Sequence, residues 1–356
     1  MKKSIGIILL TAILLVSAGK AEACTTFCLN NGKTNVYGKN YDWSVGDGAV
    51  ILNKRGLSKT AMKANDETGV PATWKSKYGS ITFNQNGREF PQGGMNEAGL
   101  VVEILVVPVG QYPAADTRPY VRKTQYRQYL LDNFSTVKEV IDSDSTIRVS
   151  GAGKGPMTHL FLSDKNGAAA VIEFIDGKRV IYTRESLPVK VLSNTAYADS
   201  LSYWKANNVP AGDKWKSVER FNRAAESAKS YTLKPTNSPV DYAFETLKQV
   251  SQGDMTQWSI VYDIENRRVF FTTLINQKKR SIDMKEVDFS CKSPIMMVDI
   301  NAGSENIAKS FQPYSMQANR KLIADVFGKT DFLKDIPEQI IEGIAVYPDS
   351  AKCEER

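Results

Sequence analysis

Short runs of apolar and β-branched residues recur along most of the chain, and turn-forming residues separate them. Apolar runs of about four to eight residues are typical of strands. They predict strands at residues 25–29, 34–38, 49–52, 80–83, 100–107, 158–163, 168–174, 179–183, 189–193, 257–263 and 268–275. Turn residues such as Asn30-Asn31-Gly32 and Asp176-Gly177 stand between several of these runs, so we expect antiparallel hairpins.

Helical periodicity appears in blocks between the strands. Residues 120–132 place Tyr126, Tyr129 and Leu130 on one face, and Thr136 and Glu139 have the spacing of a capping box before a second helix. Further helices are predicted at residues 215–229, 239–250, 317–327 and 336–345. Strands grouped with strands and helices with helices favour an α+β fold, with antiparallel sheets covered by helices.

The first 23 residues have the pattern of a secretory leader. Two lysines precede an apolar stretch at residues 5–16, and the small-residue site Ala21-Glu22-Ala23 follows. We therefore expect residues 1–23 to be a signal peptide that is removed. The remaining chain, residues 24–356, would form a single domain that is exported to the periplasm or secreted.

Charge and hydropathy exclude two classes of partner. Residues 1–23 hold three lysines and one glutamate, so their removal lowers the formal net charge from +7 to +5. This charge is spread along the chain without a block of one sign, which argues against nucleic-acid binding. No second apolar stretch is long enough to span a membrane, so we expect no stable membrane insertion after leader removal.

The few cysteines and the single histidine limit the kinds of active site and metal site that this chain could form. Four cysteines are too few for a disulfide-held fold; Cys291 and Cys353 could pair, and the sequence leaves this open. His159 is the only histidine and lies beside an apolar run, where a structural role is expected, so a histidine-based triad is disfavoured. Usable metal ligands are too few for a zinc site, and we expect no metal or organic cofactor.

Cys24 would be the first residue after leader removal. An N-terminal cysteine carries a thiol nucleophile and an α-amine, whose pKa of about 7.7–8.0 suits a general base near neutrality. A hairpin through residues 30–32 would return Lys39 and Asp42 to the neighbourhood of Cys24, where a cation lowers the pKa of a thiol. The alternatives are a chance cysteine, a cysteine that is lipidated, and a surface ion pair between Lys39 and Asp42.

Several ordered motifs resemble those of the choloylglycine hydrolase family. These are linear amide C–N hydrolases, such as bile salt hydrolases and penicillin V acylases, and belong to the N-terminal nucleophile hydrolases. The motifs are CTT at 24–26, GKNYDW at 38–43, GMNEAGL at 94–100, HLFLSDKNG at 159–167, AVIEF at 170–174, LSN at 192–194, ERFNR at 219–223 and TQWS at 256–259. Each motif is weak alone, but together they cover about residues 24–290 in the family's order.

The resemblance implies an αββα sandwich, two antiparallel sheets between helical layers, and it implies residue roles. Cys24 would supply the thiol and the amine, and Asp42 would hold that amine. Arg220 would add positive charge, and Asn194 would bind the tetrahedral oxyanion, a donor whose loss typically costs about 10²–10³ in rate. Apart from the resemblance, Asn194 could be a turn residue and Arg220 an exposed helix arginine.

Two positions depart from the family pattern. Lys39 stands where the family usually has arginine, which keeps the charge but loses the planar fork. Val106 stands where bile salt hydrolases carry an asparagine, so either Glu103 takes a polar role in the pocket or a backbone amide completes the oxyanion hole. Glu103 is therefore a candidate substrate-binding residue, with a position at the edge of a strand as the alternative.

The leading hypothesis is an exported amidase that works through a thioester on Cys24. Its partner would be a small amide with an apolar acyl group: a conjugated bile salt, penicillin V or another N-acyl amine. The alternatives are an acyltransferase of the same superfamily and a non-enzymatic surface lipoprotein lipidated at Cys24. The sequence leaves the oligomeric state open, a homo-oligomer included.

Overall fold

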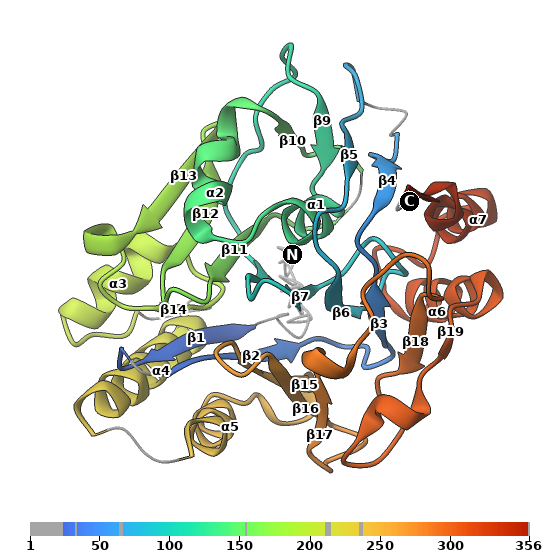
Figure 1. The fold of residues 1–356 in the computed structure, drawn as a ribbon. Helices are drawn as coiled ribbons and strands as arrows, with labels where there is room; N and C mark the ends of the chain where they lie inside the picture. Colours follow the sequence, from blue (N-terminus) through green and yellow to red (C-terminus); the bar gives the residue numbers. More distant parts are fainter. Residues whose placement is uncertain are drawn as a thin grey trace, which may run out of the picture.

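The computed structural model describes residues 24–32, 34–63, 67–153, 155–210, 215–234 and 238–354. The predicted leader, residues 1–23, lies outside the described residues. Two antiparallel sheets pack face to face, and helices cover both outer faces (Figure 1). This mixed architecture of helices and antiparallel sheets is the predicted αββα arrangement.

The first sheet begins directly after Cys24 and has six strands in the order β14-β1-β2-β15-β16-β17. Its strands are β1 (Thr25–Asn30), β2 (Asn35–Asp42), β14 (Val191–Leu192), β15 (Thr256–Asp263), β16 (Arg268–Thr273) and β17 (Arg280–Asp283). The predicted hairpin joins β1 and β2, with Thr25 opposite Asn40. Helices α4 (Trp215–Leu233) and α5 (Pro239–Gln249) cover the outer face of this sheet (Figure 1).

The second sheet has nine strands in the order β13-β12-β11-β8-β7-β6-β3-β18-β19. Its strands are β3 (Ala49–Asn53), β6 (Ser80–Asn84), β7 (Gly93–Asn96), β8 (Val101–Val106), β11 (Thr158–Ser163), β12 (Ala169–Ile175), β13 (Lys178–Thr183), β18 (Met296–Asp299) and β19 (Gln312–Pro313). Helices α1 (Tyr126–Asn133) and α2 (Val137–Asp142) lie on its outer face, and α2 begins with the predicted capping box of Thr136 and Glu139.

Smaller elements complete the fold. Two short sheets pair β9 (Tyr120–Arg122) with β10 (Arg148–Ser150), and β4 (Leu57–Thr60) with β5 (Thr73–Lys75) and β20 (Lys352–Cys353). The remaining helices are α3 (Tyr197–Lys205), α6 (Met316–Lys329) and α7 (Glu338–Val346). None of the helices within the described part of the chain is long and apolar enough to cross a membrane.

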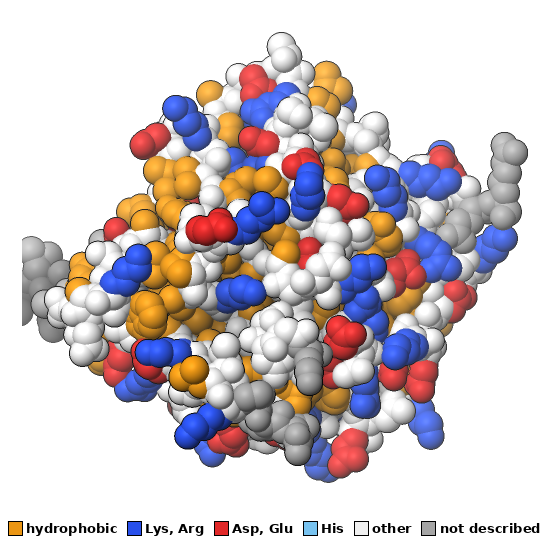
Figure 2. Space-filling model, turned by 60° about the vertical axis from the view of Figure 1, so that its left-hand side comes forward, with side chains coloured by type: hydrophobic (Ala, Val, Ile, Leu, Met, Phe, Trp, Pro, Cys, Tyr) orange, Lys and Arg blue, Asp and Glu red, His pale blue; other side chains and the backbone are white. Residues whose placement is uncertain are grey.

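Two clusters of buried apolar side chains hold the layers together. The larger fills the space between the sheets, where Tyr37 and Phe161 pack across the interface with ring centroids 5.3 Å apart, and Phe83 and Phe271 do the same at 5.3 Å. The smaller lies between the second sheet and α1 and α2. On the face drawn in Figure 2, lysines and arginines are interspersed with acidic side chains and do not form a block of one sign.

Every predicted strand is present, whereas one helix prediction is partly wrong. Residues 120–122 form the strand β9, and α1 begins only at Tyr126, because Tyr120 to Arg122 pair in parallel with β10. Local periodicity cannot anticipate such a pairing between segments far apart in the sequence. The question about Cys291 and Cys353 is settled: they form a disulfide with their Cα atoms 5.6 Å apart.

Candidate active site

Cys24 lies directly before β1 and is 3 % exposed. Its backbone N–H donates a hydrogen bond of 2.6 Å to Oδ1 of Asn194. Asn194 follows β14, which pairs with β1 so that Thr26 lies opposite Leu192. The sheet therefore brings together two residues that are 170 positions apart in the sequence.

The side-chain amide of Asn194 has a fixed orientation. Its Oδ1 also accepts a bond of 3.0 Å from Nη2 of Arg220, and its Nδ2 donates one of 2.8 Å to the carbonyl of Val106. Because Oδ1 faces two donors and Nδ2 faces an acceptor, the oxygen and nitrogen of this amide cannot exchange places. An amide nitrogen carries two hydrogens, and the bond to Val106 uses one of them.

Arg220 reaches this site from α4 and is buried. Besides the bond to Asn194, its Nε donates to Oγ1 of Thr25 at 2.9 Å, and its Nη1 donates to the carbonyl of Lys216 at 3.1 Å. Burial lowers the pKa of Arg220, and the nearby Asp42 and Cys24 oppose that shift. The exposed helix arginine that the sequence also allowed is therefore not what the structure shows.

Asp42 ends β2 and is fully buried. Its carboxylate accepts hydrogen bonds from Oγ1 of Thr256 at 2.6 Å and from Nε2 of Gln252 at 3.0 Å. Burial raises the pKa of Asp42 to about 6, against the opposing effects of Thr256, Arg220, Gln252 and Lys39. Sequence reasoning assigned no role to Thr256 or Gln252, although Thr256 belongs to the TQWS motif.

The thiol of Cys24 lies among these charges. Burial raises its pKa, while Lys39, a hydrogen bond from the Asp42 backbone and Arg220 lower it, and the Asp42 carboxylate raises it further. The structure thus gathers Cys24, Lys39, Asp42, Asn194 and Arg220 in one place. The nitrogen of Cys24 is bonded to Asn194, and the described bonds of the Asp42 carboxylate go to Thr256 and Gln252.

Lys39 and Glu103 form an ion pair between the two sheets. Their charged atoms are 3.8 Å apart, and both side chains are almost wholly buried. Lys39 also donates to the carbonyl of Ile104, and Tyr262 donates to the carboxylate of Glu103. Burial raises the pKa of Glu103 to about 7, even though Lys39 and Tyr262 lower it. A Cβ at Gly93 would lie 2.2 Å from this carboxylate, so a larger residue there would displace it.

A cavity of about 420 Å³ opens beside Cys24. Apolar side chains such as Tyr41, Trp43, Ile104 and Val106 line it together with side chains of the C-terminal helices, and the cations Lys63, Arg122, Lys123 and Arg127 also lie in its lining. Glu103 does not line the cavity, because it points to the opposite side of β8 from its neighbour Ile104. The surroundings of Cys24 thus suit an apolar ligand whose polar centre lies at the thiol.

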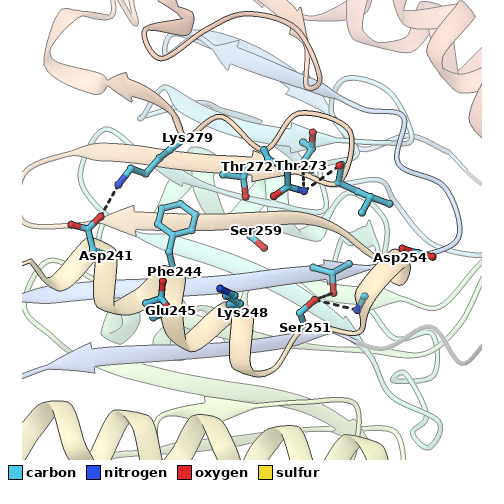
Figure 3. A pocket seen from close by; sticks show the side chains of 14 residues that line it. Asp241, Phe244, Glu245, Lys248, Ser251, Asp254, Ser259, Thr272, Thr273 and Lys279 are labelled. Carbon is cyan, nitrogen blue, oxygen red and sulfur yellow. Dashed lines mark hydrogen bonds and ion pairs between the residues drawn. The ribbon is translucent and has the colours of Figure 1, made fainter.

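A second cleft lies between α5 and the strands β15 and β16, and has a volume of about 540 Å³ (Figure 3). Polar side chains such as Ser251, Ser259 and Thr272 line it, and Lys279 and Asp241 form an ion pair of 2.6 Å at its rim. Cys24 does not line this cleft. We therefore place the chemistry in the cavity that holds the thiol.

His159 has the expected structural setting. It is fully buried, and its Nδ1 lies 2.9 Å from the carboxylate of Glu173, which also accepts the backbone N–H of Tyr197 at 2.9 Å. Within the described ranges, no group of three or more His, Cys, Asp or Glu side chains could hold a metal ion.

Solved structures share this arrangement of layers. A penicillin V acylase from Agrobacterium tumefaciens superposes with a TM-score of 0.69 and 25 % identity, over 82 % of this chain and 98 % of that one. A single-residue variant of conjugated bile acid hydrolase from Clostridium perfringens gives 0.65 at 18 % identity, over 80 % and 98 % of the two chains. The fold is therefore that of the N-terminal nucleophile hydrolases.

Sequence comparison gives the family. Residues 24–208 match the model of linear amide C–N hydrolases, choloylglycine hydrolase family. A penicillin V acylase from Pectobacterium atrosepticum is 28 % identical over 263 residues, which cover 61 % of this chain and 69 % of that protein. The chain belongs to the choloylglycine hydrolase family and is a hydrolase of linear amide C–N bonds, as the motifs predicted.

Proposed function

We propose that this chain is an exported amidase whose nucleophile is Cys24 after removal of residues 1–23. The observation that carries the proposal is the position of Cys24. Its nitrogen is held by Asn194 at 2.6 Å, and its thiol borders a largely apolar cavity. In the full-length chain this nitrogen belongs to a peptide bond and cannot act as a base. Leader removal would convert it to an amine and so activate the enzyme.

The reaction would proceed through a thioester. The α-amine of Cys24 takes the thiol proton, and Sγ attacks the amide carbonyl of the substrate. The oxyanion is stabilised by the second Nδ2 hydrogen of Asn194 and by a backbone N–H. The α-ammonium then protonates the leaving amine as the C–N bond breaks. Water, deprotonated by the same amine, hydrolyses the thioester and releases the acid.

The surrounding charges would tune the two groups of Cys24. Lys39 and Arg220 favour the thiolate, because each lowers the pKa of the thiol. Asp42 acts in the opposite sense on the thiol and would stabilise an α-ammonium at the same residue. We propose that Asn194 orients the amine by a hydrogen bond and that Asp42 supplies its counter-charge.

The substrate would be a small linear amide with an apolar acyl group. Relatives named penicillin V acylase and conjugated bile acid hydrolase make penicillin V and glycine- or taurine-conjugated bile salts the first candidates. Other N-acyl amines fit the same chemistry. Export to the periplasm or the medium follows from the predicted leader and is part of the proposal.

A substrate panel on the processed protein tests this proposal. Intact-mass analysis first establishes whether the exported chain begins with a free Cys24; a diacylglyceryl group there would contradict the amidase mechanism and support a lipoprotein. Penicillin V, conjugated bile salts and N-acyl amines are then compared for release of free acid. An acyltransferase would instead give a new amide as the main product when an amine acceptor is added.

A further inference from the structure

The C-terminal helices form one side of the cavity that holds Cys24. Its apolar lining there comes from the end of α6, the loop after it and one face of α7. We call this surface the α6–α7 wall and define it as Phe327, Phe332, Leu333, Ile336, Ile340 and Ile344. Ile340 and Ile344 are four positions apart in α7, which places them along one side of the helix, and Ile336 lies in the loop just before it.

Helix α7 has two apolar faces, and the one that does not border the cavity packs into the core and anchors the helix. Ile341 and Ala345 are buried in the main core, whereas Ile340 is 44 % exposed and Phe332 is 39 % exposed. A helix anchored by one apolar face has no folding reason to present another. Large apolar side chains left uncovered in a concave site mark a place where an apolar ligand binds.

The wall is anchored on several sides, so the cavity has its shape before a ligand enters. Asn319 of α6 donates to the carbonyl of Ala345 in α7 at 3.2 Å and accepts the backbone N–H of Arg88 at 2.8 Å. The ring of Phe332 lies nearly perpendicular to that of Trp43, next to Asp42, with ring centroids 6.3 Å apart. The disulfide between Cys291 and Cys353 encloses both helices.

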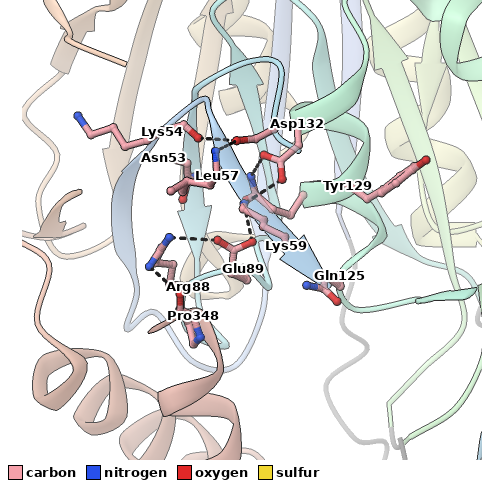
Figure 4. A network of polar contacts seen from close by, with 12 residues as sticks. Asn53, Lys54, Leu57, Lys59, Arg88, Glu89, Gln125, Tyr129, Asp132 and Pro348 are labelled. Atoms are coloured by element: carbon pink, nitrogen blue, oxygen red, sulfur yellow. Dashed lines mark hydrogen bonds and ion pairs between the residues drawn. The ribbon is translucent and has the colours of Figure 1, made fainter. Parts of the chain in front are cut away.

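A buried charge cluster fixes the loop on which Arg88 lies. Lys59 lies 2.8 Å from both Glu89 and Asp132, and Arg88 lies 3.4 Å from Glu89 (Figure 4). Arg88 also donates to the carbonyl of Pro348, just after α7. Positive and negative charges balance within the cluster, so it fastens this loop to the C-terminal segment without adding net charge to the cavity.

We propose that the α6–α7 wall is the subsite for the acyl group and selects long-chain or alicyclic acyl groups over short ones. This inference rests on the proposed function, because the carbonyl must meet Cys24 where the cavity begins. The amine parts of the candidate substrates carry a carboxylate or a sulfonate. An anion placed against Ile336, Ile340 and Ile344 would lose its hydration without a partner there, whereas Lys63 and Arg127 also line the cavity and offer positive charge outside the wall. The acyl part is therefore the one that fits the wall.

Filling the cavity gives the sharpest test. An added Cβ at Gly343 or at Gly328 would meet nothing within 4 Å, and both glycines lie in C-terminal helices, but only Gly343 lines the cavity. We expect Gly343→Leu in the processed protein to raise KM for a C12 N-acylglycine at least about tenfold and to leave a C4 N-acylglycine nearly unchanged. Gly328→Leu should leave both unchanged, since it makes the same substitution away from the ligand.

Shortening a side chain of the wall, in place of filling the cavity, provides a second test. Ile340 and Val346 both lie on α7 and are 44 % and 41 % exposed, but only Ile340 lines the cavity. Ile340→Ala should raise KM for the C12 acylglycine about fivefold, because about three methylene-sized groups leave a partly exposed contact. Val346→Ala should have no such effect. If the two variants of each pair change KM equally at every acyl chain length, the proposal is wrong.

Direct binding separates this inference from the proposed function. Calorimetry of dodecanoate binding to the processed protein requires no turnover. If no amide is hydrolysed but binding is weakened by Gly343→Leu and not by Gly328→Leu, the subsite stands and the proposed function fails. If amides are hydrolysed while the four variants change neither the chain-length preference nor the binding of dodecanoate, the subsite is wrong and the amidase remains.

Discussion

Lys39 reaches the active site from the core between the two sheets, where Glu103 is its counter-ion at 3.8 Å. The positive charge of Lys39, which would favour a thiolate at Cys24, is thus balanced by Glu103 inside the core and not by the substrate. Tyr262 donates a hydrogen bond to Glu103, and Gly93 leaves room for its carboxylate. We therefore expect Glu103 to act as a positioning residue for Lys39.

Variants of the pair separate electrostatics from packing. We expect Lys39→Met to raise the pKa of the Cys24 thiol, because a neighbouring cation that lowers it is lost. Glu103→Gln should destabilise the fold by about 3 kcal/mol, since it leaves a buried ammonium unpaired. The double variant should recover most of that stability but not the thiol reactivity. The pH dependence of alkylation and urea unfolding measure the two effects; an unchanged alkylation profile in Lys39→Met would make the lysine purely structural.

Asp42 should make the folding stability depend on pH. Its pKa in the folded protein is about 6, above its ordinary value of 3.8, because its charged form is buried. The folded state therefore holds more protons in this window, and the contribution of Asp42 to stability falls as the pH rises from about 4 to about 6. Asp42→Asn removes this loss and should stabilise the protein at pH 7 by up to about 3 kcal/mol, at about 1.36 kcal/mol per pKa unit.

Urea unfolding of the wild-type protein and of Asp42→Asn at pH 4 and pH 7 checks this expectation. The stability difference between the two proteins should be present at pH 7 and nearly absent at pH 4. A difference of the same size at both pH values would show that the carboxylate is not the titrating group. Activity should fall in the variant at pH 7, because the counter-charge of the amine is lost, and should differ little at pH 4, where Asp42 is already protonated in the wild-type protein.

Among the elements, the β1–β2 hairpin and β15 place the proposed catalytic groups. The hairpin could be predicted from the two short strand-like runs and the turn Asn30-Asn31-Gly32 between them, so the approach of Lys39 and Asp42 to Cys24 was foreseeable. Strand β15 pairs with β2 and brings Thr256 to Asp42, across 214 positions in the sequence. No local pattern reports a hydrogen bond between residues so far apart; only the TQWS motif pointed to this segment.

Thr256→Val tests that contribution of β15. The change preserves shape and removes the O–H that donates to Asp42 at 2.6 Å. Since this hydrogen bond lowers the pKa of Asp42, we expect the acidic limb of the pH profile of kcat/KM to move upward by about one unit. Ser259→Ala is the control on the same strand. Ser259 donates to Asn40 and not to Asp42, so its loss should leave the pH profile unchanged. A shift in both variants would point to a general effect on the strand.

The elements that the sequence analysis missed are short or depend on distant partners. Strand β5 has three residues and forms only by pairing with β4. Helix α3 begins after β14 without a side-chain cap that would have signalled its start. By contrast, α6 and α7 were predicted from their periodicity, but nothing in that pattern shows that one face of α7 borders Cys24. Fold class is readable from local periods, whereas the site needs contacts across the sheets.

For the molecule as a whole, the disulfide attaches the C-terminal segment to the sandwich. It links Cys291 to Cys353 across 62 residues that include α6 and α7. Because a closed loop of this length restricts the unfolded chain, Cys353→Ser should lower the free energy of unfolding by about 2–4 kcal/mol. Addition of dithiothreitol should lower the Tm of the wild-type protein but not that of the variant. Equal Tm values for the two oxidised proteins would contradict this role.

The central claim is that Cys24 is the nucleophile, and the turnover of Cys24→Ala in the processed form tests it most directly. Cys28 is the matched control, because it is also a free and buried thiol, and burial raises its pKa to about 12. We predict that Cys24→Ala loses at least about 10³-fold in kcat on the best substrate of the panel while it keeps its Tm, and that Cys28→Ala keeps most of its activity. Near-normal turnover by Cys24→Ala would contradict the account.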